Sequence, residues 1–312
     1  MLSTRFDRRL ATAALEALDK LSASTADHWW RELLSLWSPS GHLGELRLAI
    51  RNGSLNFYSN GQSIGQVSFD SLGNPRLRVH RKYVTGDPAS GSGYITINHK
   101  GDSAHSALSE GFKSSIIREW VENSARHRGP EKCFVEKVVA ESPTVIDLEM
   151  GLPAIAGQRS TLRMDIVALE RHASETRIIF WEAKMIGDAR LSSREHPPEV
   201  LRQLQKYEDY FQCADRQQAV IEAYRRNCRL LLDLHEMAVR ISPKPELHSF
   251  IRKAAEPGST LTLETKPRLL IFDDGKPRFE EKWKQRLTVL ENSGTIVTVV
   301  PPASLILSPN VP

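Results

Sequence analysis

Two apolar stretches dominate the middle of the chain: RMDIVAL at residues 163–169 and, after a short polar segment, IIFWEAK at residues 178–184. Runs of this length, separated by a hairpin-length segment, predict two neighbouring buried strands. Side chains two positions apart on a strand share a face, so Glu182 and Lys184 point the same way, and Asp165 can lie beside Glu182. The sequence therefore predicts two carboxylates and one lysine at a common place on a sheet.

This group of side chains is typical of a site for a hard divalent cation. Mg²⁺ binds a few carboxylate oxygens and keeps several waters. The ion lowers the pKa of a bound water and stabilises charge that develops on a phosphate, while a nearby ammonium can orient that water or balance the charge. We therefore expect Asp165, Glu182 and Lys184 to act on a phosphate ester with Mg²⁺, for which Mn²⁺ would substitute.

Helical segments precede and follow the two strands. Apolar residues recur at helical spacing over 131–140 and over 198–212, and the second segment carries Gln203 and Tyr207 one turn apart on one face. Further strands are expected at 146–152, 261–263, 268–272 and 295–299, and further helices at 217–239 and 279–290. This alternation predicts an α/β fold with a mixed sheet.

The order of these features resembles that of the PD-(D/E)xK nuclease superfamily. Its restriction-endonuclease-like fold carries an acidic residue on an early helix, Asp on one strand and (Asp/Glu)-x-Lys on the next. Asp165 matches the aspartate and Glu182-Ala183-Lys184 matches the tripeptide, although Met164 stands where many members have proline. The Gln203-x-x-x-Tyr207 helix is similar to that of the RecB-like branch. The resemblance covers residues 131–207, about a quarter of the chain.

The acid of the early helix is assigned to Glu131, because Phe134 and Val135 follow it as apolar residues follow this acid in relatives. Glu136 is the alternative. An acid at a helix N-terminus also interacts favourably with the helix dipole, so Glu131 has a structural interpretation beside the catalytic one.

The resemblance implies a Mg²⁺-dependent deoxyribonuclease in bacterial restriction, phage defence or DNA repair. Lys184 would position or polarise the attacking water, and Gln203 and Tyr207 would line the same cleft and hold a phosphate or a base. The metal would be bound by four groups: Asp165, Glu182, Glu131 and the Ala183 carbonyl. The alternative is a catalytically silent nuclease-like module that binds DNA or assembles with other proteins.

The (Asp/Glu)-x-Lys pattern is weak by itself, because it occurs four times, at Glu182, Glu264, Asp274 and Glu280. Only the copy at Glu182 follows a strand that carries an aspartate. A plainer interpretation of Glu182 and Lys184 is an ion pair on a solvated strand edge. For Gln203 and Tyr207 it is a solvated helix position and a half-buried aromatic residue.

The N-terminal part has a different pattern. Residues 4–38 are expected to be helical, and turn signals such as Asn52-Gly53 then separate strands at 46–50, 55–58, 64–69 and 76–83. We predict a helical and antiparallel-β region over 1–104, which binds substrate or a partner, and a nuclease-like domain over 105–312. On the last strand, period two places Arg76, Arg78, His80 and Lys82 on one face, which either binds phosphate or shields an edge strand.

Composition limits the remaining functional classes. The formal net charge of +4 lies in residues 1–100, with twelve Lys and Arg against eight acidic residues, while the other 212 residues are neutral. A polyanion such as DNA is therefore allowed as partner, through the N-terminal part. No run approaches the roughly 20 apolar residues of a membrane span. Three scattered cysteines favour a reducing, cytoplasmic setting. Action as a homodimer or within a multi-component system stays open.

Overall fold

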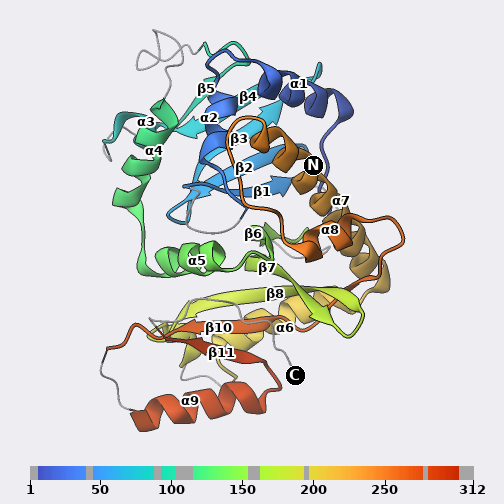
Figure 1. The fold of residues 1–312 in the computed structure, drawn as a ribbon. Coiled ribbons are helices and arrows are strands. Elements are labelled where there is room, and N and C mark those ends of the chain that lie inside the picture. The colour runs from blue at the N-terminus through green and yellow to red at the C-terminus, as the bar shows by residue number, and fades with distance from the viewer. Residues whose placement is uncertain are drawn as a thin grey trace.

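The computed structural model describes residues 6–39, 45–87, 93–102, 115–153, 162–192, 197–276 and 280–301. It is a mixed α/β structure with two sheets, one antiparallel and one mixed, each packed against helices (Figure 1). No helix in these ranges is long and apolar enough to cross a membrane.

The first sheet is antiparallel, as the turn signals predicted for four strands, and it has five strands in sequence order. Its strands are β1 (Arg47–Arg51), β2 (Ser54–Ser59), β3 (Gln62–Phe69), β4 (Pro75–His80) and β5 (Tyr94–Ile97). Its apolar face, with Leu55 and Phe57 of β2, belongs to one buried cluster with α1 (Thr12–Ala23) and α2 (Trp29–Leu36). Residues that pair across neighbouring strands point to the same side of the sheet, so the polar side chains lie together on the opposite face.

The fourth strand is shorter than period two predicted. It ends at His80, whose Nδ1 accepts a hydrogen bond of 3.2 Å from the Lys82 backbone N–H and so caps the short helix α3 (Arg81–Thr85). The prediction that Lys82 continues the strand was therefore wrong. The interpretation of an edge strand was also wrong, because β4 pairs with β3 on one side and with β5 on the other.

The second sheet is mixed and has the strand order β11-β10-β8-β7-β6, with β9 also paired to β8. Strands β6 (Val145–Gly151), β7 (Arg163–His172) and β8 (Glu175–Met185) are antiparallel neighbours. Strands β9 (Leu261–Leu263) and β10 (Arg268–Phe272) run parallel to β8, and β11 (Val297–Val300) runs parallel to β10. The predicted strand pair at the centre of the sequence is therefore also central in the sheet.

Helices cover both faces of this sheet. The helices of this half are α5 (Pro130–Glu141), α6 (Glu199–Phe211), α7 (Ala214–Val239), α8 (Ser249–Ala255) and α9 (Glu280–Asn292), whereas α4 (Ile116–Ser124) packs on α2, α3 and β3. Trp181 and Ala183 of β8 share a buried cluster with Phe134 of α5. On the other face of β8, Phe180 stacks on Phe211 of α6 with ring centroids 5.0 Å apart. Glu182 and Lys184 continue that second face towards the end of the strand.

Helix α5 lies between the two sheets (Figure 1). The β2–β3 turn packs on it so closely that a Cβ at Gly61 would lie 2.4 Å from the Lys132 Cβ, and Gly61 also has a φ of +66°. Asp147 of β6 also connects the two parts of the chain. It is buried and accepts hydrogen bonds from Arg8 and Arg51 of the N-terminal part. The domain boundary expected near residue 105 lies outside the described residues.

Candidate active site

The two carboxylates and the lysine converge at the ends of β7 and β8. Asp165 Oδ2 accepts a hydrogen bond of 2.8 Å from the Ala183 N–H and lies 4.0 Å from Lys184 Nζ. The Lys184 ammonium also bonds Glu182 Oε1 and, at 2.8 Å, the Ala183 carbonyl oxygen. The strand pairing thus brings together the residues that spacing alone had placed side by side.

This group is buried, which excludes an ordinary ion pair on a solvated edge. Glu182 is 2 % exposed and Lys184 is 1 % exposed, whereas the Asp165 side chain is 20 % exposed. One carboxylate oxygen, Glu182 Oε2, is buried and has no hydrogen-bond partner among the described residues. Native proteins rarely leave such an atom unpaired, because its lost hydration is costly. The site is therefore short of positive charge or hydrogen-bond donors at Glu182.

The ionisation of both carboxyls reflects this shortage. Burial and, next, the Glu182 carboxylate raise the pKa of Asp165 to about 8. Burial also raises the pKa of Glu182, against the opposing effect of the Lys184 ammonium. Two carboxylates with one ammonium in a low-dielectric site resist full ionisation. A bound divalent cation would supply the missing charge.

Helix α6 holds the carboxylate from the other side. Gln203 Nε2 donates a hydrogen bond of 2.8 Å to Glu182 Oε1. The Tyr207 hydroxyl donates instead to the Arg163 backbone carbonyl on β7, and the ring is 1 % exposed. Burial, reinforced by Glu182, raises the pKa of the Tyr207 phenol, so it stays protonated. Gln203 thus orients a site residue, whereas Tyr207 fixes the helix against the strand.

The helix acid of the sequence pattern lies nearby but is not part of this cluster. Glu131 pairs with Arg190 at 3.7 Å, and Arg190 is held by Asp188 at 2.5 Å. Glu131 and Asp165 line the same small cavity of about 50 Å³. The alternative acid, Glu136, faces the first sheet, where it lies 3.7 Å from Arg47 and accepts from the Gly61 N–H.

Sequence reasoning missed Arg190. It lies six residues after Lys184, in a short helical turn capped by Asp188. The only available signal was an arginine soon after the Glu-x-Lys strand, which is too common to be informative. Its position between β8 and α5 appears only when these distant segments pack together.

The residues present fit a magnesium ion, although with few ligands. Within the described ranges no group of three or more His, Cys, Asp and Glu side chains forms a metal-binding cluster. Asp165, Glu182 and the Ala183 carbonyl would offer three oxygens, and Mg²⁺ commonly completes such a set with water. The unpartnered Glu182 Oε2 is the atom that such an ion would satisfy.

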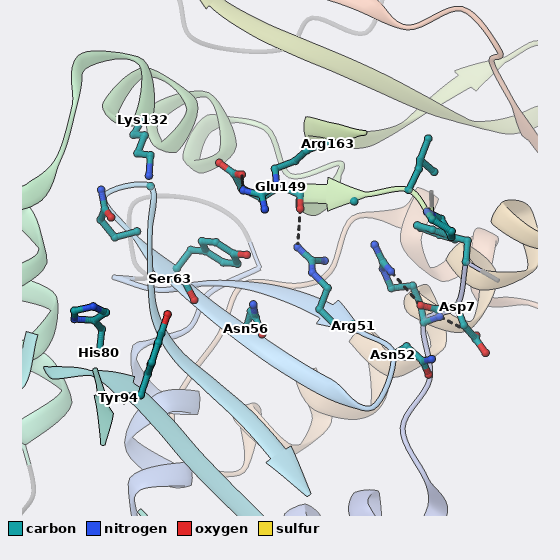
Figure 2. A pocket seen from close by; sticks show the side chains of 18 of the residues that line it. Asp7, Arg51, Asn52, Asn56, Ser63, His80, Tyr94, Lys132, Glu149 and Arg163 are labelled. Carbon is teal, nitrogen blue, oxygen red and sulfur yellow. Dashed lines mark hydrogen bonds and ion pairs between the residues drawn. The ribbon is translucent and has the colours of Figure 1, made fainter. Parts of the chain in front are cut away.

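The basic residues predicted to bind substrate lie elsewhere, on the first sheet. Arg76 pairs with Asp70 at 3.5 Å, and the Arg78 guanidinium stacks 4.0 Å from the centre of the Tyr94 ring. Lys82 lines a large cavity of about 720 Å³, which we call the inter-sheet cavity. Figure 2 shows it between the polar face of the first sheet and the β6–β7 edge of the second.

The inter-sheet cavity adjoins the carboxylate site. It shares four lining residues with the small cavity that contains Asp165: Tyr58, Gly61, Lys132 and Glu149. No protein-family model, curated protein or solved structure matches this chain. Inferences about function therefore depend on the geometry of these two neighbouring sites and on the order of the sequence motifs.

Proposed function

We propose that this chain is a metal-dependent nuclease that hydrolyses phosphodiester bonds in DNA. The observation that carries the proposal is the convergence of Asp165, Glu182 and Lys184 in a buried site where one Glu182 oxygen has no partner among the described residues. Buried ionisable groups are expensive, and they persist mainly where they are paired or used. In this site the pairing of the Glu182 carboxylate is incomplete, which favours a functional role for these residues.

The arrangement of elements supports a restriction-endonuclease-like fold. The PD-(D/E)xK pattern has a helix with an acid, a strand with Asp and a strand with (Asp/Glu)-x-Lys, and its RecB-like branch adds a helix with Gln-x-x-x-Tyr. In this chain α5, β7, β8 and α6 carry these features in that order, and they pack around one end of the β7–β8 pair. This correspondence of fold and motif is the second support for nuclease activity.

The residues of the site have distinct tasks in the proposed reaction. A Mg²⁺ or Mn²⁺ ion held by Asp165, Glu182 and the Ala183 carbonyl would supply a water of lowered pKa and positive charge near the phosphate. Lys184 adds a second positive charge and can donate a hydrogen bond to the attacking water. Gln203 keeps the Glu182 carboxylate in its orientation through their hydrogen bond.

The first sheet would provide the surface that binds the substrate. Its polar face carries Arg78, His80 and Tyr94, and the adjacent Lys82 and Lys132 line the inter-sheet cavity. Cationic and aromatic side chains on one surface favour a phosphate backbone and its bases. In this proposal the N-terminal surplus of charge binds the DNA that the second sheet cuts. A role in restriction, phage defence or DNA repair within the cytoplasm is part of the same proposal.

The test is cleavage of labelled single- and double-stranded DNA with Mg²⁺ or Mn²⁺ by the wild type and Lys184→Ala. We expect the variant to lose at least about 100-fold in rate, as when a charge-stabilising group is removed. Lys266→Ala is the matched control, because Lys266 ends another Glu-x-Lys copy but is exposed and outside the site. Cleavage that persists unchanged in Lys184→Ala would overturn the site. DNA binding by the wild type without any cleavage would instead favour a catalytically silent module.

A further inference from the structure

The inter-sheet cavity has features that a metal-dependent cleavage site does not require. Its volume of about 720 Å³ lies within the range of roughly 300–1,000 Å³ that is usual for sites of small organic ligands. Its lining comes from β2, β3, α3, β5, α5 and the β6–β7 edge, so both sheets contribute to it (Figure 2). The cavity therefore depends on how the N-terminal part packs on the rest.

One end of the cavity is cationic and lacks counter-charge. Lys82 of α3 and Lys132 of α5 both line it, and among the described residues neither has a carboxylate partner. The two positive charges repel each other. Burial and, next, the Lys132 ammonium lower the pKa of Lys82. Two ammonium groups at one end of a cavity, with no carboxylate partner among the described residues, form a binding place for an anion.

The other charged groups of the lining each have a partner of opposite charge. Arg163 pairs with Glu149 at 3.3 Å, and Arg8 and Arg51 both bind the buried Asp147. Asp7 pairs with Arg226 at 2.9 Å and with Arg9 at 3.1 Å. Within the described lining, Lys82 and Lys132 are therefore the charged groups that no carboxylate engages.

The wall next to the lysines suits a nucleobase. Asn56 of β2 faces the cavity, and its Oδ1 is buried without a hydrogen-bond partner in the described structure. An acceptor of this kind is satisfied by an N–H group on the edge of a base. Tyr94 is half exposed at the cavity and is backed by the Arg78 guanidinium, so its free ring surface can stack on a base.

We propose that the inter-sheet cavity binds one nucleotide of the DNA strand, with its phosphate between Lys82 and Lys132 and its base against Asn56 and Tyr94. This assignment of the strand rests on the proposed nuclease function. The shared lining at Tyr58 and Lys132 connects the cavity to the Asp165 site, so a strand can occupy both. The bound nucleotide would then fix where the strand is cut relative to that position.

Binding is measured in EDTA, where no cleavage occurs, by calorimetry or fluorescence anisotropy. The probes are a short 5′-phosphorylated single-stranded oligonucleotide, a 5′-mononucleotide, a nucleoside and inorganic phosphate. We expect Lys82→Gln and Lys132→Gln each to weaken oligonucleotide binding about tenfold or more, since each removes a charge-assisted contact. Lys137→Gln, on the same helix but exposed outside the cavity, should bind like the wild type. Asn56→Leu should weaken binding of the nucleotide but not of inorganic phosphate.

Each part of the proposal has its own contrary result. Equal oligonucleotide affinity in Lys132→Gln, Lys82→Gln and Lys137→Gln would overturn the phosphate site. Inorganic phosphate that binds as tightly as the nucleotide, together with a silent Asn56→Leu, would overturn the base contact. A mononucleotide that binds where the oligonucleotide does not would indicate a free nucleotide ligand and overturn the strand assignment.

Failure of the nuclease proposal gives a different pattern. A wild type that binds the oligonucleotide through Lys132 but cleaves nothing with Mg²⁺ contradicts the nuclease and leaves the cavity assignment intact. A wild type that cleaves, with Lys82→Gln and Lys132→Gln unaffected in binding and in KM, contradicts the cavity assignment alone.

Discussion

Two buried acidic clusters in this molecule differ in how completely their charges are paired. Asp147 on β6 accepts hydrogen bonds from Arg8, Arg51, Tyr224 and its own neighbour's backbone N–H. Despite full burial, the two arginines hold the pKa of Asp147 below its usual value. The cluster of Asp165 and Glu182 has one ammonium for two carboxylates, and both of their pKa values are raised.

The contrast separates a structural charge cluster from a candidate functional one. Around Asp147 every donor stabilises the ionised carboxylate, so the cluster fastens the N-terminal part to the second sheet. Around Glu182 an oxygen remains unpaired, although one more donor would have satisfied it. A site that leaves buried charge uncompensated is expected to bind a ligand that completes it.

The largest expected effect is on the free energy of unfolding, and it differs between the Asp147 cluster and the cluster of Asp165 and Glu182. Asp147→Asn should lower the free energy of unfolding by about 3–5 kcal/mol, because it leaves two buried guanidiniums without their counter-charge. At neutral pH, Asp165→Asn should leave the free energy of unfolding nearly unchanged or raise it, because the wild-type Asp165 carboxyl already resists ionisation. Urea denaturation of both variants measures the difference. Equal losses would mean that both clusters are structural.

The sequence predicted the cluster of Asp165 and Glu182 better than the cluster around Asp147. Asp165, Glu182 and Lys184 lie on adjacent strands, so strand periodicity alone brings them close. Asp147 meets Arg8 and Arg51, which are 139 and 96 residues away, and no local pattern encodes such a contact. Arg190 beside Glu131 and Lys132 beside Lys82 were missed for the same reason.

Local errors had a different physical cause. The alternating side chains predicted a strand through Tyr83, and the strand does extend as far as His80. The His80 side chain then accepts a hydrogen bond from the backbone N–H two residues on, and such a cap can start a helix. Helix α8 was not predicted, because its seven residues are too few for a clear period. The strands β7 and β8 were predicted correctly because long strands with buried central segments carry the strongest pattern.

The next effect in size comes from metal binding. Mg²⁺ or Mn²⁺ at about a hundred times its Kd should stabilise the wild type by about 2.7 kcal/mol, visible as a rise in Tm. Glu182→Gln should lose this shift, whereas Asp147→Asn should keep it at a lower starting Tm. An equal shift in Glu182→Gln would place the ion elsewhere in the molecule.

The pH dependence of stability should be smaller and opposite for the two aspartates. The folded pKa of Asp165, about 8, exceeds its value of 3.8 without the fold, so its contribution is favourable at low pH and is lost as pH rises towards 8. We therefore expect Asp165→Asn to gain stability relative to the wild type as pH rises from 4 to 8. For Asp147 the folded pKa is lowered from 3.8, so its contribution is full above pH 4 and is lost only as pH falls below that value. Urea titrations of Asp165→Asn and Asp147→Asn from pH 8 to below pH 4 compare the two, and parallel curves would contradict the difference.

The smallest expected effect concerns the side chain that holds Glu182 without touching substrate. Gln203→Leu removes the hydrogen bond to Glu182 Oε1 and should lower kcat about tenfold, equivalent to about 1.4 kcal/mol, with KM for DNA unchanged. Gln205→Leu is the control, because that residue lies on the same helix but bonds the exposed Asp209 at 2.9 Å. A purely structural role for Gln203 would lower Tm and leave kcat intact. A selective loss of kcat would therefore mark the Glu182 cluster as the one whose orientation is used in catalysis.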